Sequence, residues 1–368
     1  MALSVGIVGL PNVGKSTLFN ALSSKQAEAA NYAFCTIEPN VGVVPVPDAR
    51  FDALCGVVHP DKTVPATVDF VDIAGLVRGA SKGEGKGNAF LANIRECDAI
   101  AEVVRCFEDE NILHVENKVD PVADIDTIET ELALKDLDTV QKRLDKARRA
   151  AKGGNAYEKK VIEVCEELEK VLDQGRLARE AKLGDDEEKD KIARELALLT
   201  RKPLFYVCNV KEEQLGAHEK DPMVNRVRER AAKSGADVVV ICAKLEAEIM
   251  QLPPAERPDF LASAGLTEPG LNQVIRTGYA MLELITYFTA GKQEVRAWTI
   301  KRGTKAPQAA GKIHTDFEKG FIKAEVIWWE DRVNLKTEAA VREAGKLRIE
   351  GKEYVVKDGD VMHFRFNV

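Results

Sequence analysis

The most constraining feature of this 368-residue sequence is a stretch near its start, Gly9-Leu10-Pro11-Asn12-Val13-Gly14-Lys15-Ser16-Thr17. It fits the pattern G-x-x-x-x-G-K-[ST], whose glycines let backbone N–H groups turn inward around phosphate oxygens. A short apolar run, residues 4–8, precedes it, and a helix-like segment follows from Thr17. This order aims the positive end of a helix at the loop. The stretch predicts an α/β fold with a phosphate-binding loop, against the weaker alternative of a glycine turn without a ligand.

The chemistry of the loop assigns roles to its side chains. Lys15 is expected to reach the β- and γ-phosphates, and the Ser16 hydroxyl to bind Mg²⁺. Downstream, Asp72-Ile73-Ala74-Gly75 follows the strand-like run 67–72. Asp72 is expected to hold Mg²⁺ through water, and the Gly75 N–H to sense the γ-phosphate. A D-x-x-G motif is weak alone and becomes strong behind a phosphate-binding loop.

Two segments between these motifs and beyond them have the pattern of nucleotide-dependent switches. In residues 34–40, Thr36 could give Mg²⁺ a second hydroxyl ligand when the γ-phosphate is present, so the segment would order on triphosphate binding. A Pro-containing surface turn is the alternative. Residues 78–87 are rich in glycine, which disfavours a stable helix and predicts a second, mobile switch.

Composition narrows the class of protein. No apolar run approaches the ~20 residues of a membrane span, and the seven scattered cysteines predict reduced thiols and a cytoplasmic location. A net charge of −7 argues against a general nucleic-acid coat, and no DNA specificity is evident. Residues 291–368 nevertheless carry 16 basic against 12 acidic side chains, which permits contact with RNA without requiring it.

The pattern of segments predicts a discontinuous organisation. Alternating strand-like and helix-like segments give way to a charged helical stretch, and strand-like runs return at 202–208 and 237–241. Three further strand-like runs, 295–300, 321–327 and 361–366, predict a small sheet. The predicted domains are a nucleotide-binding domain of residues 1–125 plus 201–278, a helical insertion of residues 126–200, and a C-terminal α+β domain of residues 281–366.

Within the insertion, the apolar residues predict an antiparallel helical hairpin. Tyr157, Val161, Val164, Leu168 and Val171 are spaced by 4, 3, 4 and 3, as in a coiled-coil seam. Residues 152–155, which include two glycines, separate this seam from a less regular apolar stripe. Two arms of about 25 residues would project ~35–40 Å. A helical lid packed on the sheet is the competing interpretation.

Two segments compete for the nucleotide base. Asn117-Lys118-Val119-Asp120 matches the guanine-reading pattern N-K-x-D, whereas Asn209-Val210-Lys211-Glu212 departs from it. We favour the second because Asn209 directly follows an apolar strand-like run. Glu212 is one methylene longer than Asp, and Val210 replaces the lysine stem that packs the base, so guanine preference should be lost. Asn209 could still bond adenine N6/N7, which predicts ATP as the ligand.

Taken together, these motifs resemble the YchF/Obg-like ATPase family, and residues 297–322 resemble its TGS domain. The resemblance implies a translation-factor-class, Obg-related P-loop fold with a coiled-coil insertion. It also implies ATP hydrolysis in preference to GTP and association with the ribosome or ribosomal RNA. It assigns nucleotide contacts to Asn12, Val13, Gly14, Lys15, Ser16, Thr17, Asn209 and Val210. It assigns Mg²⁺ to Ser16 and Thr36.

The catalytic step needs an unusual group. Many GTPases place a glutamine after D-x-x-G to orient water, but this chain has Leu76. His114 is the candidate replacement, and relatives carry a histidine at the matching place. The alternative is a surface-loop histidine. A K⁺ ion held by Asn12, as in some related hydrolases, could supply positive charge.

The sequence therefore favours an ATP-hydrolysing switch that acts on the translation machinery. Two alternatives stay open. One is an RNA- or ribosome-binding module whose nucleotide sets shape with negligible turnover. The other is a guanine-specific GTPase of the Obg type.

Overall fold

The computed structural model describes residues 3–29, 40–73, 86–115 and 118–367. Thr36, Gly75, Leu76, Asn117 and residues 78–85 of the predicted second switch lie outside these ranges. The chain forms two compact units. One comprises Met1–Ser24, Glu38–Gly42 and Phe70–Val274, and the other Lys25–Ile37, Val43–Asp69 and Ile275–Val368. Each unit is considered by itself below.

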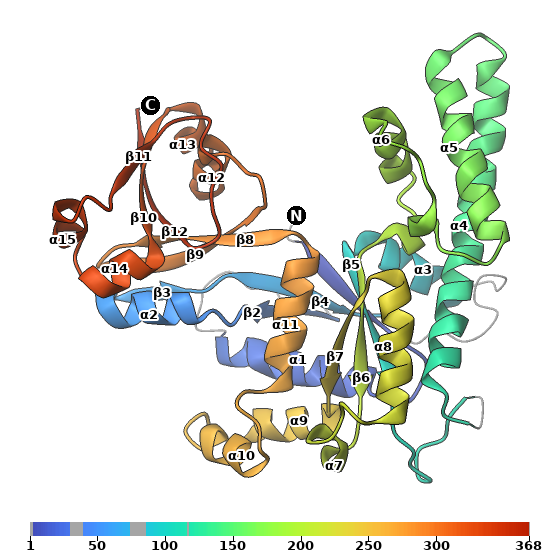
Figure 1. Cartoon of the computed structure of the whole chain (residues 1–368), viewed down its shortest axis with the longest axis horizontal. Helices are drawn as coiled ribbons and strands as arrows, with labels where there is room; N and C mark the ends of the chain where they lie inside the picture. Colours follow the sequence, from blue (N-terminus) through green and yellow to red (C-terminus); the bar gives the residue numbers. More distant parts are fainter. Residues whose placement is uncertain (1–2, 30–39, 74–85, 116–117, 368) are drawn as a thin grey trace. The chain divides into compact units, whose positions relative to one another are not determined.

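A six-stranded sheet forms the core of the first unit, although parts of two of its strands, residues 43–45 and 67–69, are grouped with the second unit (Figure 1). In spatial order its strands are β2 (Val41–Pro45), β4 (Thr67–Asp72), β1 (Ser4–Val8), β5 (Ala99–Arg105), β6 (Leu204–Asn209) and β7 (Asp237–Ile241). The pairs β1–β5, β5–β6 and β6–β7 are parallel. Every residue of β5 and β6 is buried, as expected for central parallel strands, although β5 includes the charged Glu102 and Arg105.

Helices alternate with these strands and bring the loops that precede or follow them to one edge of the sheet. They are α1 (Lys15–Ala29), α3 (Lys86–Glu96), α7 (Glu212–Leu215), α8 (Pro222–Ser234), α9 (Ala243–Gln251), α10 (Arg257–Ser263) and α11 (Gly270–Met281). Because β1, β5, β6 and β7 are parallel, their carboxyl ends share one edge, where ligands of open α/β sheets bind. In the part of the chain that is described, no helix combines the length and apolarity needed to cross a bilayer.

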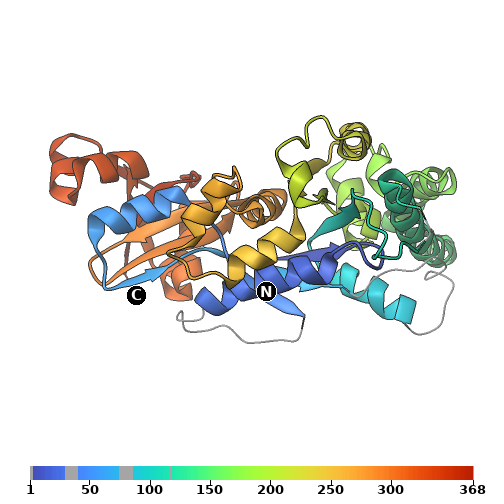
Figure 2. The same ribbon diagram turned by 90° about the horizontal axis from the view of Figure 1, so that it is seen from below.

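The insertion contains the predicted hairpin, but its arms are unequal. Its elements are α4 (Pro121–Ala151), α5 (Ala156–Asp173), η1 (Ala178–Glu180), α6 (Glu187–Glu195) and η2 (Leu199–Arg201). The arms have 31 and 18 residues rather than about 25 each. Asp120 caps the start of α4, and Gly175, in the left-handed region, follows α5. Seen end-on in Figure 2, α4 and α5 lie side by side.

Helix α4 belongs to two cores, which reconciles the two interpretations of the helical stretch. Its beginning packs on β5 and α8, where Ile125 and Ile128 are buried. Its second half packs on α5 through Val140 and Leu144, opposite Val161, Val164 and Leu168. The predicted seam is therefore buried, except that Tyr157 at its end is 37% exposed.

A buried carboxylate closes the insertion at its base. Asp136 of α4 accepts hydrogen bonds from the backbone N–H groups of Leu199 and Thr200 at 2.7 and 2.8 Å. It also accepts one from the Thr200 hydroxyl at 2.6 Å. Burial raises the pKa of this fully buried carboxyl, and these three bonds oppose the shift. These hydrogen bonds attach η2, where the insertion ends, to α4.

The second unit is a six-stranded sheet with helices. Its strands, in spatial order, are β11 (Arg348–Glu350), β10 (Phe321–Trp328), β12 (Asp360–Phe366), β8 (Leu284–Ala290), β9 (Glu294–Lys301) and β3 (Lys62–Val64). Its helices are α2 (Ala49–Val58), α12 (Ala306–Ile313), α13 (Thr315–Lys319), α14 (Trp329–Leu335) and α15 (Glu338–Glu343). Aromatic and aliphatic side chains from β8, β10, β12 and α12 form its core.

This sheet includes a strand far from the C-terminus in sequence. Lys62, Thr63 and Val64 of β3 pair in parallel with Glu294, Val295 and Arg296 of β9. The second compact unit therefore contains residues 43–69 as well as the C-terminal segment that the sequence predicts to form a domain. A three-residue strand has no detectable period, so only its backbone pairing shows this connection.

Candidate functional site

The phosphate-binding loop runs between β1 and α1, as the motif requires. Gly9 and Gly14 have φ of +154° and +100°, and Asn12 also lies in the left-handed region at 63°. A Cβ at Gly14 would lie 2.3 Å from Asn209 Nδ2, so only glycine fits there. Helix α1 begins at Lys15 and points its N-terminal N–H groups at the loop, where they can bind an anion.

Two oppositely charged side chains, Lys15 and Asp72, interact electrostatically at the loop. Lys15 is buried and its Nζ donates to the Leu10 carbonyl at 2.9 Å. Burial lowers the pKa of Lys15, and the nearby Asp72 charge opposes the shift. Burial also raises the pKa of Asp72, and Lys15 opposes it. A bound phosphate would add negative charge beside Lys15 and so raise its pKa again.

The donor set around Asp72 fits a hard divalent cation. Asp72 Oδ1 is buried and, among the residues that the structure describes, has no hydrogen-bond partner. Ser16, the second residue of α1, is exposed. Carboxylate and hydroxyl oxygens are the ligands that Mg²⁺ prefers. The predicted third member of the set, Thr36, lies outside the described residues.

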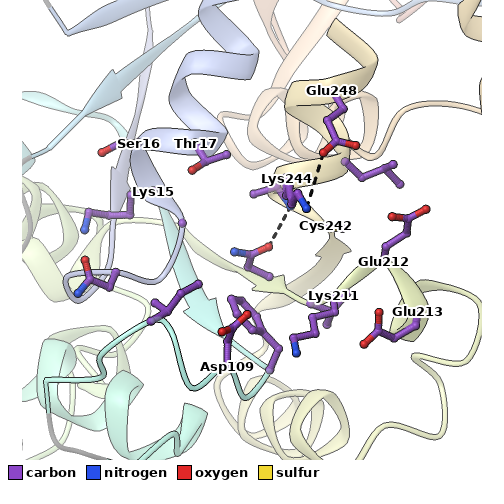
Figure 3. Close-up of a pocket in the computed structure, with 18 residues that line it drawn as sticks. Lys15, Ser16, Thr17, Asp109, Lys211, Glu212, Glu213, Cys242, Lys244 and Glu248 are labelled. Atoms are coloured by element: carbon purple, nitrogen blue, oxygen red, sulfur yellow. Dashed lines mark hydrogen bonds and ion pairs between the residues drawn. The ribbon is translucent and has the colours of Figure 1, made fainter. Parts of the chain in front are cut away.

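A cavity of about 630 Å³ extends from the loop toward the ends of β6 and β7 (Figure 3). The phosphate end is lined by Gly14, Lys15, Ser16 and Thr17, together with Asn12. The opposite end is lined by residues 209–213 and 242–245, Glu248, Phe107, Asp109 and Ile112. The loop, the Asn209 segment and the turn at Cys242 thus share one cavity, whose volume suits a nucleotide.

Asn209 joins the two ends of this cavity. Its Nδ2 donates to the Val13 carbonyl at 2.9 Å, and its Oδ1 accepts from the Ala243 N–H at 2.9 Å. The side chain is 5% exposed. The amide therefore fixes the phosphate-binding loop to the turn after β7, a link made by a donor and an acceptor on one planar group.

In the segment that matches N-K-x-D literally, Asp120 serves as the N-cap of a helix. Asp120 caps α4 by accepting from the Val122 and Ala123 N–H groups at 3.2 and 3.3 Å. It also pairs with Arg226 at 2.8 Å. Of the four motif positions, Asn117 lies outside the described residues, and neither Lys118 nor Asp120 lines the cavity in the described part of the chain. This arrangement supports Asn209, rather than Asn117, as the segment beside the base.

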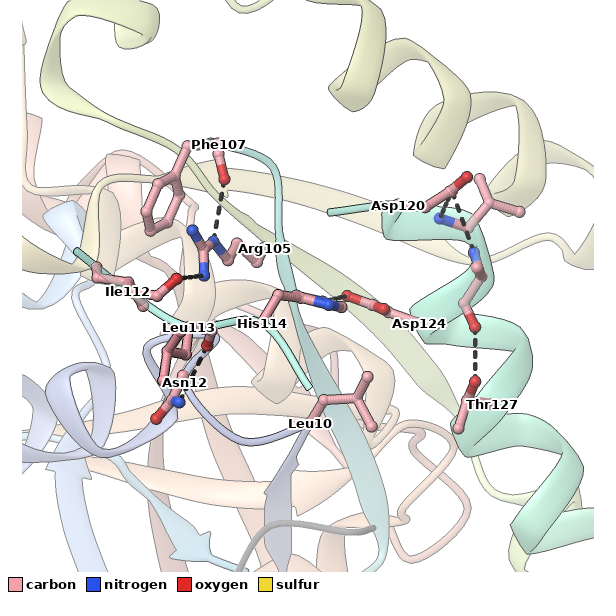
Figure 4. A network of polar contacts seen from close by, with 12 residues as sticks. Leu10, Asn12, Arg105, Phe107, Ile112, Leu113, His114, Asp120, Asp124 and Thr127 are labelled. Carbon is pink, nitrogen blue, oxygen red and sulfur yellow. Dashed lines mark hydrogen bonds and ion pairs between the residues drawn. The ribbon is translucent and has the colours of Figure 1, made fainter. Parts of the chain in front are cut away.

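His114 lies near the loop but turns away from it. Figure 4 shows its ring directed at Asp124 in the first turn of α4. Nε2 and Asp124 Oδ2 are 2.9 Å apart, and the two side chains are 4% and 6% exposed. The preceding residue, Leu113, is 78% exposed, and its carbonyl accepts from Asn12 Nδ2 at 3.1 Å. The backbone beside His114 is thus attached to the phosphate-binding loop.

A buried arginine that the sequence analysis missed holds the same segment. Arg105 ends β5 and donates to the carbonyls of Phe107, Ile112 and Asp109 at 3.0, 3.0 and 3.2 Å. It is 1% exposed, and burial lowers its pKa. Its sequence signal is an arginine that ends a buried strand whose one other charged residue is Glu102. Asp124 was missed as well, since its partner lies ten residues away across a loop.

Glu102 of β5 and Glu129 of α4 belong to a cluster of buried ionisable groups. Glu102 of β5 is completely buried, and neither carboxylate oxygen has a hydrogen-bond partner within the described ranges. Burial, reinforced by the charge of Glu129, raises its pKa well above the ordinary value. Glu129 itself accepts from the Tyr206 hydroxyl at 2.9 Å and pairs with Arg230. Burial therefore favours the neutral, protonated form of Glu102.

Comparison with known proteins assigns the family. A protein of Haemophilus influenzae named ribosome-binding ATPase YchF is 56% identical over 368 residues, all of both chains. This chain belongs to the YchF family. The proteins of the same name from Escherichia coli O157:H7 and Bacillus subtilis are 56% and 52% identical, again over the full length of both chains.

Structure and family models agree with this assignment. The structure of the Schizosaccharomyces pombe YchF GTPase superposes with a TM-score of 0.88 at 40% identity, covering 99% of this chain and 97% of that one. A model described as a 50S ribosome-binding GTPase matches residues 4–141. The YchF GTPase C-terminal model, described as a protein of unknown function, matches residues 284–367. The predicted family and fold class are confirmed: a P-loop domain, a helical insertion and a TGS-like C-terminal region.

Proposed function

We propose that this member of the YchF family is a ribosome-binding ATPase that hydrolyses ATP with Mg²⁺. The observation that carries the proposal is the single cavity joining the phosphate-binding loop to the Asn209 segment. The full-length relatives named ribosome-binding ATPase support both the reaction and the partner. A cytoplasmic location, where ribosomes are found, belongs to the same proposal.

The base end of the cavity supports adenine over guanine. A guanine site needs a carboxylate that accepts from N1–H and N2–H₂ together, whereas Glu212 opens the short helix α7 with a longer side chain. Val210 is 2% exposed and offers an apolar surface. Because the Asn209 amide is bonded to Val13 and Ala243, we assign it the task of fixing the wall against which the base lies.

Mg²⁺ would be held by Ser16, by Asp72 through water, and by Thr36, and would neutralise charge that develops on the phosphates. Lys15 would exchange its internal bond to the Leu10 carbonyl for a phosphate oxygen. His114 would orient the attacking water after leaving Asp124. The residues that already lie at the loop therefore bind and position the nucleotide, whereas His114 first has to leave Asp124.

A K⁺ ion is a second source of positive charge. Asn12 lies in the left-handed region and uses its Nδ2 to hold Leu113, which leaves its Oδ1 as a ligand for a cation. Turnover measured in K⁺ and in Na⁺ at equal ionic strength tests this role. We expect at least ~10-fold faster turnover in K⁺, since 1.4 kcal/mol of transition-state stabilisation suffices. Equal rates would exclude the ion.

Competition binding of ATP and GTP separates the main proposal from the guanine-specific alternative. The wild-type protein should prefer ATP, and Glu212→Asp should move the preference toward GTP by about 10-fold, the equivalent of 1.4 kcal/mol. Glu213→Asp, at the next residue lining the same cavity, is the matched control. A wild-type protein that binds GTP as tightly as ATP would contradict the assignment.

A rate measurement decides between the ATPase and a binding module with negligible turnover. Phosphate release from ATP should be detectable without ribosomes and should increase when ribosomes are added. Co-sedimentation with ribosomes tests the partner directly. Ribosome binding with no phosphate release under either condition would favour the module.

A further inference from the structure

The far end of the α4–α5 hairpin has a charge opposite to that of the rest of the chain. Residues 142–160, which we call the hairpin tip, contain eight Lys and Arg against two Asp and Glu, a net charge of +6. The other 349 residues carry 45 basic and 58 acidic side chains, a net charge of −13. Within the same insertion, residues 121–141 and 161–200 each carry −5. The positive charge is therefore confined to one end of the hairpin.

The cations of the tip face solvent rather than the partner helix. Val140, Leu144 and Ala147 form the buried seam of α4, and Lys142, Lys146 and Arg149 follow two residues after each of them. Two residues are about 200° of helix, so these cations lie on the face opposite α5. Lys159 precedes Val161 of α5 by two residues, so it also lies about 200° from that buried position. All four cations are exposed.

Half of these eight cations form ion pairs within the protein. Lys142 pairs with Asp138, Arg143 with Glu158, Arg148 with Glu166, and Lys160 with Asp186 and Glu188. Among the described residues, no ion pair involves Lys146, Arg149, Lys152 or Lys159. For an exposed cation without an ion-pair partner, the free-energy cost of desolvation on binding a phosphate is small. Its binding also releases counterions from the phosphate backbone.

The shape of the tip allows close approach. The turn consists of Lys152, Gly153, Gly154 and Asn155, and it lies at the end of the hairpin away from the sheet (Figure 1). Gly154 has φ of +84°, and a Cβ placed there would meet no atom within 4 Å. Small residues therefore separate the cations, and a bulky polyanion can reach the backbone of the turn.

We propose that the hairpin tip binds the phosphate backbone of ribosomal RNA. The inference rests on the proposed function, which supplies the ribosome as partner, and it specifies the surface and the chemistry of contact. Phosphate is favoured over an acidic protein surface because the cations are spread along two helices and a turn, spaced about one turn (5.4 Å) apart on α4. Among the described residues of the tip, Tyr157 is the only large apolar side chain that is exposed. Cations arranged in this way match the regularly spaced phosphates of an RNA backbone.

The test is a charge-neutralising triple variant of the tip, Lys146→Gln with Arg149→Gln and Lys152→Gln. Glutamine keeps helix propensity, so the hairpin should fold. The matched control removes three exposed lysines from the acidic body of the same insertion, Lys170→Gln with Lys182→Gln and Lys191→Gln. Both variants lower the net charge by three, and both leave the nucleotide cavity untouched. Circular dichroism and basal ATP turnover should equal those of the wild type.

Binding to purified ribosomes and to protein-free ribosomal RNA is then measured over a series of salt concentrations. For the tip variant we expect at least ~10-fold weaker binding to both, and a slope of log K against log[salt] that is smaller by about 2–3. The control variant should change affinity less than ~2-fold. Unchanged affinity of the tip variant, or equal losses in both variants, would overturn the proposal.

The two ligands separate the remaining outcomes. A tip variant that loses affinity for ribosomes but not for protein-free RNA would place the contact on a ribosomal protein and overturn the RNA assignment. A wild-type protein that fails to bind ribosomes would refute the proposed function instead, and the RNA measurement would still decide the role of the tip.

Discussion

His114 Nε2 lies 2.9 Å from Asp124 Oδ2, and both side chains are buried. The candidate catalytic histidine is therefore held against the first turn of α4, while the neighbouring Leu113 carbonyl is held by Asn12 of the phosphate-binding loop. The backbone of this segment is already at the loop, and the imidazole has to leave Asp124 before it can act there. Hydrolysis by this route carries the cost of breaking the bond to Asp124 before water can be oriented.

Replacing His114 by alanine should slow hydrolysis without weakening nucleotide binding. A positioned general base or water-orienting group contributes about 10²–10⁴-fold, so turnover should fall by that order. The Kd for ATP should stay within ~2-fold, because His114 does not line the cavity within the described ranges. Single-turnover phosphate release and equilibrium binding measure the two quantities. His363→Ala, at an exposed histidine of the second unit, is the control. Wild-type turnover in His114→Ala would remove this residue from the mechanism.

Weakening the Asp124 bond should speed basal hydrolysis. Asp124→Asn keeps the shape and an acceptor but removes the charge, and hydrogen bonds to charged groups exceed neutral ones by about 1 kcal/mol. Releasing His114 more easily should raise turnover without ribosomes about 5-fold. The double variant Asp124→Asn with His114→Ala should show no gain, which separates a positioning role from a change in stability. Slower turnover in the single variant would mean that the docked histidine is the productive one.

Asn209 should support nucleotide affinity through its two bonds. Asn209→Asp keeps the acceptor for the Ala243 N–H and loses the donor to the Val13 carbonyl, whereas Asn209→Ala loses both. With about 0.5–1.5 kcal/mol for each bond, ATP affinity should fall in two steps, roughly 3–10-fold for each bond removed. Isothermal titration gives the affinities. An alanine variant that binds ATP like the wild type would show that the link is dispensable.

The buried Glu102 should make stability depend on pH. Because burial raises its pKa above the ordinary value of 4.5, the folded state holds a proton that the unfolded state loses. Its contribution is complete below pH 4.5 and is lost as pH rises toward its folded pKa, at up to about 1.4 kcal/mol per pH unit. Glu102→Gln, a neutral isostere, should flatten this decline. Urea unfolding at pH 5, 6, 7 and 8 measures it. Parallel pH profiles for the two proteins would contradict the assignment.

Local sequence signals predicted much of the first unit. The apolar runs that become β1, β4 and β7 have the bounds expected from the sequence, because buried parallel strands are continuous in sequence. The loop motif predicted its own environment for the same reason: Gly9 to Thr17 contains every residue that shapes it. The α5 seam was also recognisable, since its period repeats over four turns.

Interactions between distant residues were not predictable. Arg105 donates to three backbone carbonyls that a loop brings together around its side chain. Every residue has a backbone carbonyl, so the sequence does not show which ones will bind the arginine. The pairing of β3 with β9 joins residues more than 200 positions apart. The unequal arms of the hairpin follow from Asp120 serving as a helix cap, a role that its match to N-K-x-D concealed.

Helix α4 has no break between Asp124, beside the histidine, and Lys146, in the hairpin tip. The two residues are 22 positions apart, which corresponds to roughly 33 Å of continuous hydrogen-bonded helix. A rod of this kind transmits tilt and rotation along its whole length. A displacement of the hairpin tip would therefore also move Asp124, which holds His114. Binding at the tip and release of the histidine are thus connected through α4.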